Sequence, residues 1–112
     1  MAALTLIEDL SAARQHLWKF QERFNYFPDL NVEINGFRFN FKDTEVWWRA
    51  PLLPPYLKIE MKPETLRAVL DREDHYNNVE IGCRLRMQRR PNTYAPDAHM
   101  ILSFFHLPGA RR

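Results

Sequence analysis

The chain has 112 residues and a formal net charge of +2, from 16 Lys and Arg against 14 Asp and Glu. This length fits a single domain, residues 1–112, and so small a charge does not by itself argue for a nucleic-acid partner. The one cysteine, Cys83, excludes a disulfide within the chain, so a cytoplasmic location is expected. No basic leader and no apolar run of about 20 residues are present, so we expect no signal peptide and no membrane association.

The first predicted element is a helix from about Thr5 to Phe24. Its apolar residues recur every three or four positions, which places them on one helix face. Thr5 and Glu8 have the spacing of a capping box, which predicts that the helix starts there. We expect the apolar face to pack on the core. The alternative is a dimer contact, because the repeat is also typical of a coiled coil. The stripe consists of Leu6, Leu10, Ala13, Leu17, Phe20 and Phe24.

A β-hairpin is predicted from Leu30 to Phe41. Asn35-Gly36 favours a two-residue type I′ turn, because both residues tolerate the positive φ that this turn requires. The turn sets the register, which places apolar pairs on one face and polar pairs on the other. The expected apolar pairs are Ile34–Phe37, Val32–Phe39 and Leu30–Phe41, and the expected polar pairs are Glu33–Arg38 and Asn31–Asn40.

The segment from Asp43 to Pro55 contains three prolines, so we expect an edge strand or a loop there. Residues 56–61 alternate apolar and polar, which predicts a strand. A helix should follow from Pro63 at its first position to about Glu73, with Leu66, Val69 and Leu70 buried. Two more strands are expected, Glu80–Gln88 and His99–Leu107, the second apolar on both faces and therefore central. The prediction is an α+β two-layer domain with helices on one face of a mostly antiparallel sheet.

The strand Glu80–Gln88 carries the first candidate site. Alternate residues of a strand point the same way, so Arg84, Arg86 and Arg90 should form a line of guanidinium groups suited to phosphates or carboxylates. Aromatic side chains nearby could add a stacking surface. The alternative is a solvated face on which the arginines pair with carboxylates. The aromatic residues are Trp47, Trp48 and Tyr56, and the carboxylates are Glu33, Glu60 and Glu80.

The loop before that strand is the second candidate site. It concentrates hydrogen-bonding side chains, which could hold a polar ligand, and Glu80 beside His75 could act as an acid/base pair. Asparagines also favour turns, so a plain connecting turn is the alternative. The residues of this candidate site are His75, Tyr76, Asn77, Asn78 and Glu80.

The adjacent tryptophans suggest a covered surface. In an extended segment Trp47 and Trp48 point to opposite sides, so one of them should face outward. Beside prolines, an outward Trp is typical of a subunit contact or a ligand lid. The alternative is that both pack beneath the loop of residues 51–55.

Other chemistries are not indicated. The four histidines lack the spacing of metal ligands, and there is no second cysteine, so no metal site is expected. Cys83 lies between Ile81 and Leu85 on an apolar strand face, which favours a core residue over a nucleophile. No glycine-rich phosphate loop is present, and no cofactor is expected.

Part of the chain, about Val46 to Leu107, resembles the C-terminal region of long metallo-β-lactamase-fold proteins similar to CMP-N-acetylneuraminate hydroxylase. The segments that carry the resemblance are WWRxPxxPPYLKI (47–59), HYNNVEIGC (75–83), RRP (89–91) and SFFH (103–106). That family's metal chemistry lies in a domain with a His-x-His-x-Asp-His cluster and in a Rieske domain, and this chain has neither. The resemblance therefore implies a detached module that caps a partner's active site, helps to bind a nucleotide-sugar-like anion, or mediates assembly. No catalytic residue can be carried over.

The expected function is a non-catalytic binding or assembly module. Its partner would be a small anionic ligand or a protein, and it would form a homodimer. The alternatives are a small enzyme that acts on a polar anionic metabolite through His75 and Glu80, and a single-stranded nucleic-acid-binding protein that uses the arginines and the aromatic residues.

Overall fold

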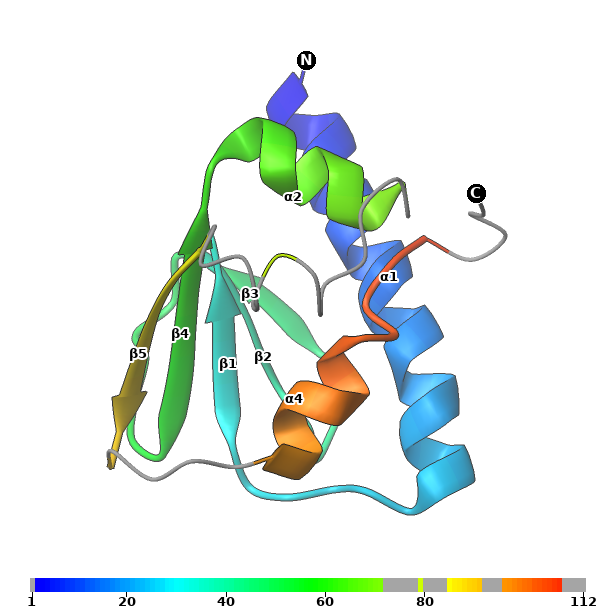
Figure 1. Cartoon of the computed structure of the whole chain (residues 1–112), viewed down its shortest axis with the longest axis vertical. Coiled ribbons are helices and arrows are strands. Elements are labelled where there is room, and N and C mark those ends of the chain that lie inside the picture. The colour runs from blue at the N-terminus through cyan, green and yellow to red at the C-terminus, as the bar shows by residue number, and fades with distance from the viewer. Residues whose placement is uncertain (1, 72–78, 80–84, 92–95, 108–112) are drawn as a thin grey trace.

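The structure is a computed structural model that describes residues 2–71, 79, 85–91 and 96–107 (Figure 1). It has the predicted α+β architecture of one sheet with helices packed against it. In chain order the elements are α1 (Ala2–Phe24), β1 (Asn31–Ile34), β2 (Phe37–Asn40), β3 (Val46–Trp48), β4 (Tyr56–Met61), α2 (Pro63–Leu70), β5 (Leu85–Arg90) and α4 (Pro96–Leu102).

The five strands form one sheet in the order β3-β2-β1-β4-β5. Adjacent strands are antiparallel except β1 and β4, which run parallel. The mostly antiparallel sheet of the prediction is therefore confirmed. The short strand β1 lies at the centre, with β2 on one side and β4 on the other. The segment 43–55 contributes β3 as an edge strand, as its prolines indicated.

The hairpin has the predicted register. Asn35 and Gly36 have φ values of 50° and 91°, as a type I′ turn requires. The Asn35 side chain also reaches the end of β4, where its Nδ2 donates to the Met61 carbonyl and its Oδ1 accepts from the Met61 amide, both at 2.9 Å. The confirmed cross-strand pairs are Asn31–Asn40, Val32–Phe39, Glu33–Arg38 and Ile34–Phe37.

One apolar core joins the sheet to helices α1, α2 and α4. Alternate residues of β1, β2 and β4 are buried, while their neighbours along each strand are not. Helix α1 contacts both α2 and α4 (Figure 1). After α4 the Leu107 amide donates to the Leu70 carbonyl at 2.9 Å, which ties the later chain to the end of α2. The core strand residues are Val32, Ile34, Phe37, Phe39, Leu57 and Ile59, and the helix residues include Leu10, Leu17, Leu66, Val69, Leu70, Ala98, Ile101 and Leu102.

Helix α1 is longer than predicted. It begins at Ala2, so Thr5 lies inside it and the predicted capping box is wrong. Residues 2–4 are Ala, Ala and Leu, which are strong helix formers and extend the helix toward the N-terminus. The middle of the apolar stripe is buried as expected, but Phe24 at its end is 49% exposed.

A buried arginine fixes α1 to the end of β2. The Arg14 side chain has no exposed surface, and its Nη1 donates to the Gln21 Oε1 at 2.7 Å. Its Nη2 donates to the carbonyls of Asp43 at 2.6 Å and Asn40 at 3.1 Å. Gln21 in turn donates to the Phe41 carbonyl at 2.7 Å. These bonds supply donors to the carbonyls of Phe41 and Asp43 and a second donor to the Asn40 carbonyl, which also accepts from the Asp43 amide at 3.2 Å.

The predicted last strand, His99–Leu107, is wrong. Residues 96–102 form helix α4, and helical turns continue to Phe105, whose amide donates to the Leu102 carbonyl at 2.9 Å. The alternating pattern of the sequence had no polar face, so it did not distinguish a central strand from a buried helix. The spacing of the buried residues is that of a helix face. These residues are Ala98, Ile101, Leu102 and Phe105.

Helix α2 starts with Pro63 at its first turn and buries the three predicted residues, but it ends at Leu70 rather than near Glu73. Arg67 links α2 to α1, because its Nη1 donates to Asp9 at 2.7 Å and its other nitrogens bind Asp71. Strand β5 runs from Leu85 to Arg90, so it includes Arg89 and Arg90, which the predicted strand omitted.

Candidate functional site

The predicted site residues fall into two groups. His75, Tyr76, Asn77, Asn78, Glu80 and Arg84 lie outside the described residues, so the loop site and its acid/base pair stay predictions. Arg86 is exposed on β5, Tyr56 is half-buried at the start of β4, and Trp47 and Trp48 are exposed on β3.

Strand pairing places several predicted residues on one surface, the face of the sheet that does not form the core. We call it the open sheet face. One row across it runs from Trp47 through Arg38, Glu33 and Lys58 to Gln88. The next row runs from Asn40 through Asn31 and Tyr56 to Arg90, and Glu60 pairs with Arg86 beyond the first row. The arginines of β5 therefore share a face with Trp47 and Tyr56.

Of the charged residues on this face, Glu60, Arg86 and Arg90 are exposed, whereas Glu33, Arg38 and Lys58 are half-buried. The Arg38 guanidinium lies 5.9 Å from the centre of the Trp47 ring, which is a cation–π arrangement. Lys58 Nζ lies 3.9 Å from the Glu60 carboxylate. Arg86 and Arg90 take part in none of the ion pairs between described residues, so pairing with Glu33 or Glu60 is wrong for the part of the chain described.

Trp48 points to the other side of β3, because it pairs with the core residue Phe37. It lies at the sheet edge, where it is 40% exposed, and Trp47 is 49% exposed. The interpretation that both tryptophans pack beneath the loop of residues 51–55 is therefore wrong. Arg49 follows with φ 57°, and its guanidinium lies 5.8 Å from the Trp48 ring.

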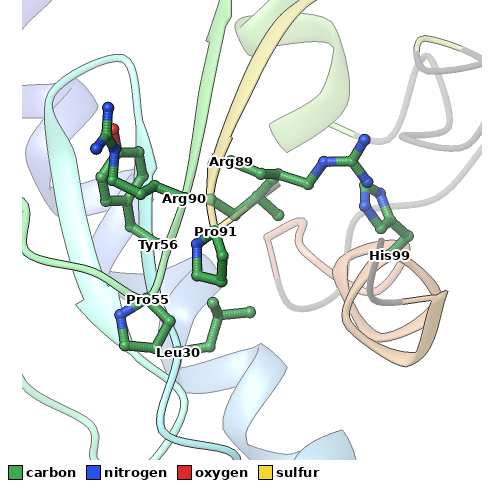
Figure 2. A pocket seen from close by; sticks show the side chains of 8 residues that line it. Leu30, Pro55, Tyr56, Arg89, Arg90, Pro91 and His99 are labelled. Carbon is green, nitrogen blue, oxygen red and sulfur yellow. The ribbon is translucent and has the colours of Figure 1, made fainter. Parts of the chain in front are cut away.

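A pocket of about 160 Å³ opens at the end of the sheet where β1 and β4 begin and β5 ends. We call it the sheet-end pocket (Figure 2). Its walls come from the strand ends, the segment before β1 and helix α4. The lining residues are Leu30, Pro55, Tyr56, Leu57, Arg89, Arg90, Pro91 and His99.

Strand register explains how these residues converge. Leu57 pairs with Arg89 on the core side of the sheet, and Tyr56 pairs with Arg90 on the open side. The Asn31 amide donates to the Pro55 carbonyl at 3.0 Å, and the Asn31 Nδ2 donates to the Leu53 carbonyl at 2.7 Å. These two bonds hold the loop before β4 against the start of β1, and so hold Pro55 in the pocket wall.

Helix α4 supplies the far wall of the pocket. His99 lies in its first turns and is almost fully buried. Figure 2 shows the half-buried Arg89 side chain extending from β5 toward the His99 ring, while Leu30, Pro55 and Pro91 lie together below it. The pocket thus combines apolar walls with a guanidinium and an imidazole on one side.

The described lining residues include no carboxylate, serine or cysteine, and the titratable side chains among them other than arginine are Tyr56 and His99. A cavity of roughly 150 Å³ with apolar walls can hold a benzene-sized group. Arginine presents five N–H donors in a planar fork, which can bind carboxylate or phosphate oxygens.

Most of the pocket was missed from the sequence, because Tyr56 and Arg90 were the only described lining residues assigned to a candidate site. The wrong prediction of a strand at His99–Leu107 hid the role of α4, because it gave no reason to place His99 in a pocket wall. The helical spacing of residues 98, 101, 102 and 105 was the signal that could have revealed this wall.

Among the described residues there is no cluster of three or more His, Cys, Asp or Glu side chains that could hold a metal ion. None of the described helices is both long and apolar enough to cross a bilayer. Comparisons with protein-family models, with curated proteins and with solved structures find no match. The resemblance to the CMP-N-acetylneuraminate hydroxylase group therefore stays a prediction, and so does the homodimer.

Proposed function

We propose that this chain is a non-catalytic binding domain for a small ligand with an apolar body and an anionic end. The ligand would occupy the sheet-end pocket. The observation that carries the proposal is the meeting of apolar walls with the Arg89 side chain, which extends toward His99, in one concave site (Figure 2). Concave, mostly apolar sites with a few polar groups are the usual places where proteins bind small molecules.

The residues that line the sheet-end pocket predict how the ligand would be oriented in it. The apolar body would lie against Leu30, Leu57 and the two prolines, where it would remove apolar surface from water at roughly 25 cal/mol per Å². The anionic end would accept hydrogen bonds from the Arg89 guanidinium, which has enough donors to keep its partners in the protein and bind the ligand as well.

The test is a thermal-shift and calorimetric comparison of four probes: benzoate, phenyl phosphate, benzyl alcohol and inorganic phosphate. Benzoate and phenyl phosphate combine a ring with an anion, benzyl alcohol lacks the charge, and inorganic phosphate lacks the ring. We expect the two aromatic anions to bind best. A probe at 100 times its Kd should stabilise the fold by about 2.7 kcal/mol, which is several degrees of Tm.

Two substitutions separate the two parts of the site. Leu30→Phe should fill the pocket and abolish binding of both aromatic anions, whereas Arg89→Gln should weaken the anions and leave benzyl alcohol unchanged. The matched control is Arg86→Gln, which removes the same charge from the open sheet face. If Leu30→Phe leaves binding intact in a folded protein, or if none of the probes binds, the proposal is wrong.

A further inference from the structure

The open sheet face has more positive than negative side chains. Among the described strand residues of this face there are four cations, on β2, β4 and β5, and two carboxylates, on β1 and β4. The density is greatest on β4 and β5, where the described charged residues are the cations Lys58, Arg86 and Arg90 and the carboxylate Glu60. The described cations of the face are Arg38, Lys58, Arg86 and Arg90, and the carboxylates are Glu33 and Glu60, together with Asp29 at its border, whose Oδ1 accepts from the Asn40 Nδ2 at 3.0 Å.

The β4–β5 part of this face is also slightly hollowed. A depression of about 170 Å³ is lined by Lys58, Glu60, Arg86, Met87 and Gln88. Arg86 and Arg90 are four residues apart on one strand, so their side chains leave the sheet roughly 13 Å from each other. Both are exposed, and neither is held in an ion pair with another described residue.

Aromatic side chains stand at two positions of the same face. Tyr56 lies on β4 directly opposite Arg90, and Trp47 lies on the edge strand β3 beside Arg38. The strands β3 and β4 are three steps apart in the sheet, which corresponds to roughly 14 Å. The face therefore offers flat apolar rings and separated cations on one accessible surface.

We infer that the open sheet face binds single-stranded nucleic acid. The phosphates would contact Lys58, Arg86 and Arg90, and unpaired bases would stack on Tyr56 and Trp47. Stacking rings beside a track of cations are the means by which single strands are bound without sequence specificity. An acidic peptide would use the cations equally well but would gain little from the exposed rings. This activity goes beyond ligand binding in the sheet-end pocket, with which it shares the two lining residues Tyr56 and Arg90.

The test is fluorescence anisotropy of a labelled oligothymidylate of about twelve nucleotides, measured over a range of salt concentrations. Three phosphate contacts predict a slope of log K against log salt of about −2 for a single strand. Affinity should therefore fall roughly twentyfold between about 50 and 200 mM salt. Arg86→Gln should lower the affinity and reduce the magnitude of the slope by about 0.7.

Trp47→Ala tests the stacking part, because it removes a ring without changing charge. It should weaken binding about tenfold and leave the salt slope unchanged. The matched control for Arg86→Gln is Arg23→Gln, which removes the same charge from an exposed position on α1, in the layer opposite this face. Circular dichroism of each variant establishes that the fold is retained.

Three results would overturn the inference. The first is no binding of the oligonucleotide at low salt. The second is an equal loss of affinity in Arg23→Gln and Arg86→Gln, which would indicate attraction by the net charge alone. The third is binding of poly-glutamate as tight as that of the oligonucleotide with no effect of Trp47→Ala, which would assign the face to an acidic protein partner.

Discussion

The guanidinium of Arg14 lies 4.5 Å from the centre of the Phe39 ring, and the arginine side chain is fully buried. Burial lowers the pKa of Arg14 to about 10, against the opposing effect of the negative charge of Asp43. The group is therefore still charged at neutral pH. Its charge is balanced by the ring and by the carbonyl groups of Asn40 and Asp43.

Replacing this arginine should be costly. Arg14→Ala removes the donor of the Asp43 carbonyl and of the Gln21 amide oxygen, and one of the two donors of the Asn40 carbonyl, so we expect a loss of about 3 kcal/mol in the free energy of unfolding. Urea unfolding followed by circular dichroism measures this loss. The control is Gln15→Ala, at the exposed neighbouring position on α1. A loss below about 1 kcal/mol would show that the hydrogen bonds of Arg14 do not hold α1 to β2.

The turn of the first hairpin makes a second prediction. Changing Asn35 and Gly36 together to Val should destabilise the fold by about 3 kcal/mol or more, because β-branched residues resist positive φ and the bonds to Met61 are lost. Thermal unfolding should show a drop in Tm of roughly 4 °C for each kcal/mol. An unchanged Tm would contradict the register of β1 and β2.

Helix α4 can be distinguished from a strand by two lysine substitutions. Met100 and Leu102 would share a face in a strand, but in α4 Met100 is 52% exposed and Leu102 is fully buried. Met100→Lys should therefore change the free energy of unfolding by no more than about 0.5 kcal/mol, whereas Leu102→Lys should cost at least about 4 kcal/mol. Similar costs at both positions, measured by urea unfolding, would favour the strand.

Tyr26 should make the free energy of unfolding depend on pH in the alkaline range. Burial, and then the negative charge of Asp97, raise the pKa of its phenol above the usual value of 10.0. The folded chain thus holds this proton more tightly than the unfolded chain does. The resulting stabilisation is complete below pH 10 and is lost as pH rises through the folded-state pKa. Urea unfolding above pH 10 should therefore show a steeper loss of stability in the wild type than in Tyr26→Phe, and equal slopes would contradict this.

The sequence correctly predicted those helices and strands that were marked by more than one local feature. The Asn35-Gly36 turn, the alternation along β4 and the stripe of α2 each combined a turn or capping residue with a clear period. Residues 99–107 lacked such a combination. Their apolar residues fit the two-residue period of a strand and the period of three to four residues of a helix equally well, so the pattern did not decide between the two. Because of this ambiguity, the sequence did not indicate that His99 lines the sheet-end pocket.

The parallel contact between β1 and β4 could not be predicted from local pattern either, because it depends on which strands meet across the whole fold. It determines that Tyr56 begins its strand beside Asn31, and so where the pocket opens. The burial of Arg14 was equally unexpected, because a charged side chain beside the apolar stripe of a helix normally reaches solvent. Only the assembled carbonyl groups around Arg14 explain its burial.

The parallel pair also divides the sheet into two sequence-contiguous halves. Strands β3, β2 and β1 come from the chain before residue 50, and β4 and β5 come from the chain after it, so the hydrogen bonds between β1 and β4 are the seam that joins them. The exposed segment around Pro51 and Leu53 carries the chain from one half to the other. Cleavage there would yield two fragments that each hold one side of the seam. Reassembly of those fragments would report directly on how strongly the halves recognise each other.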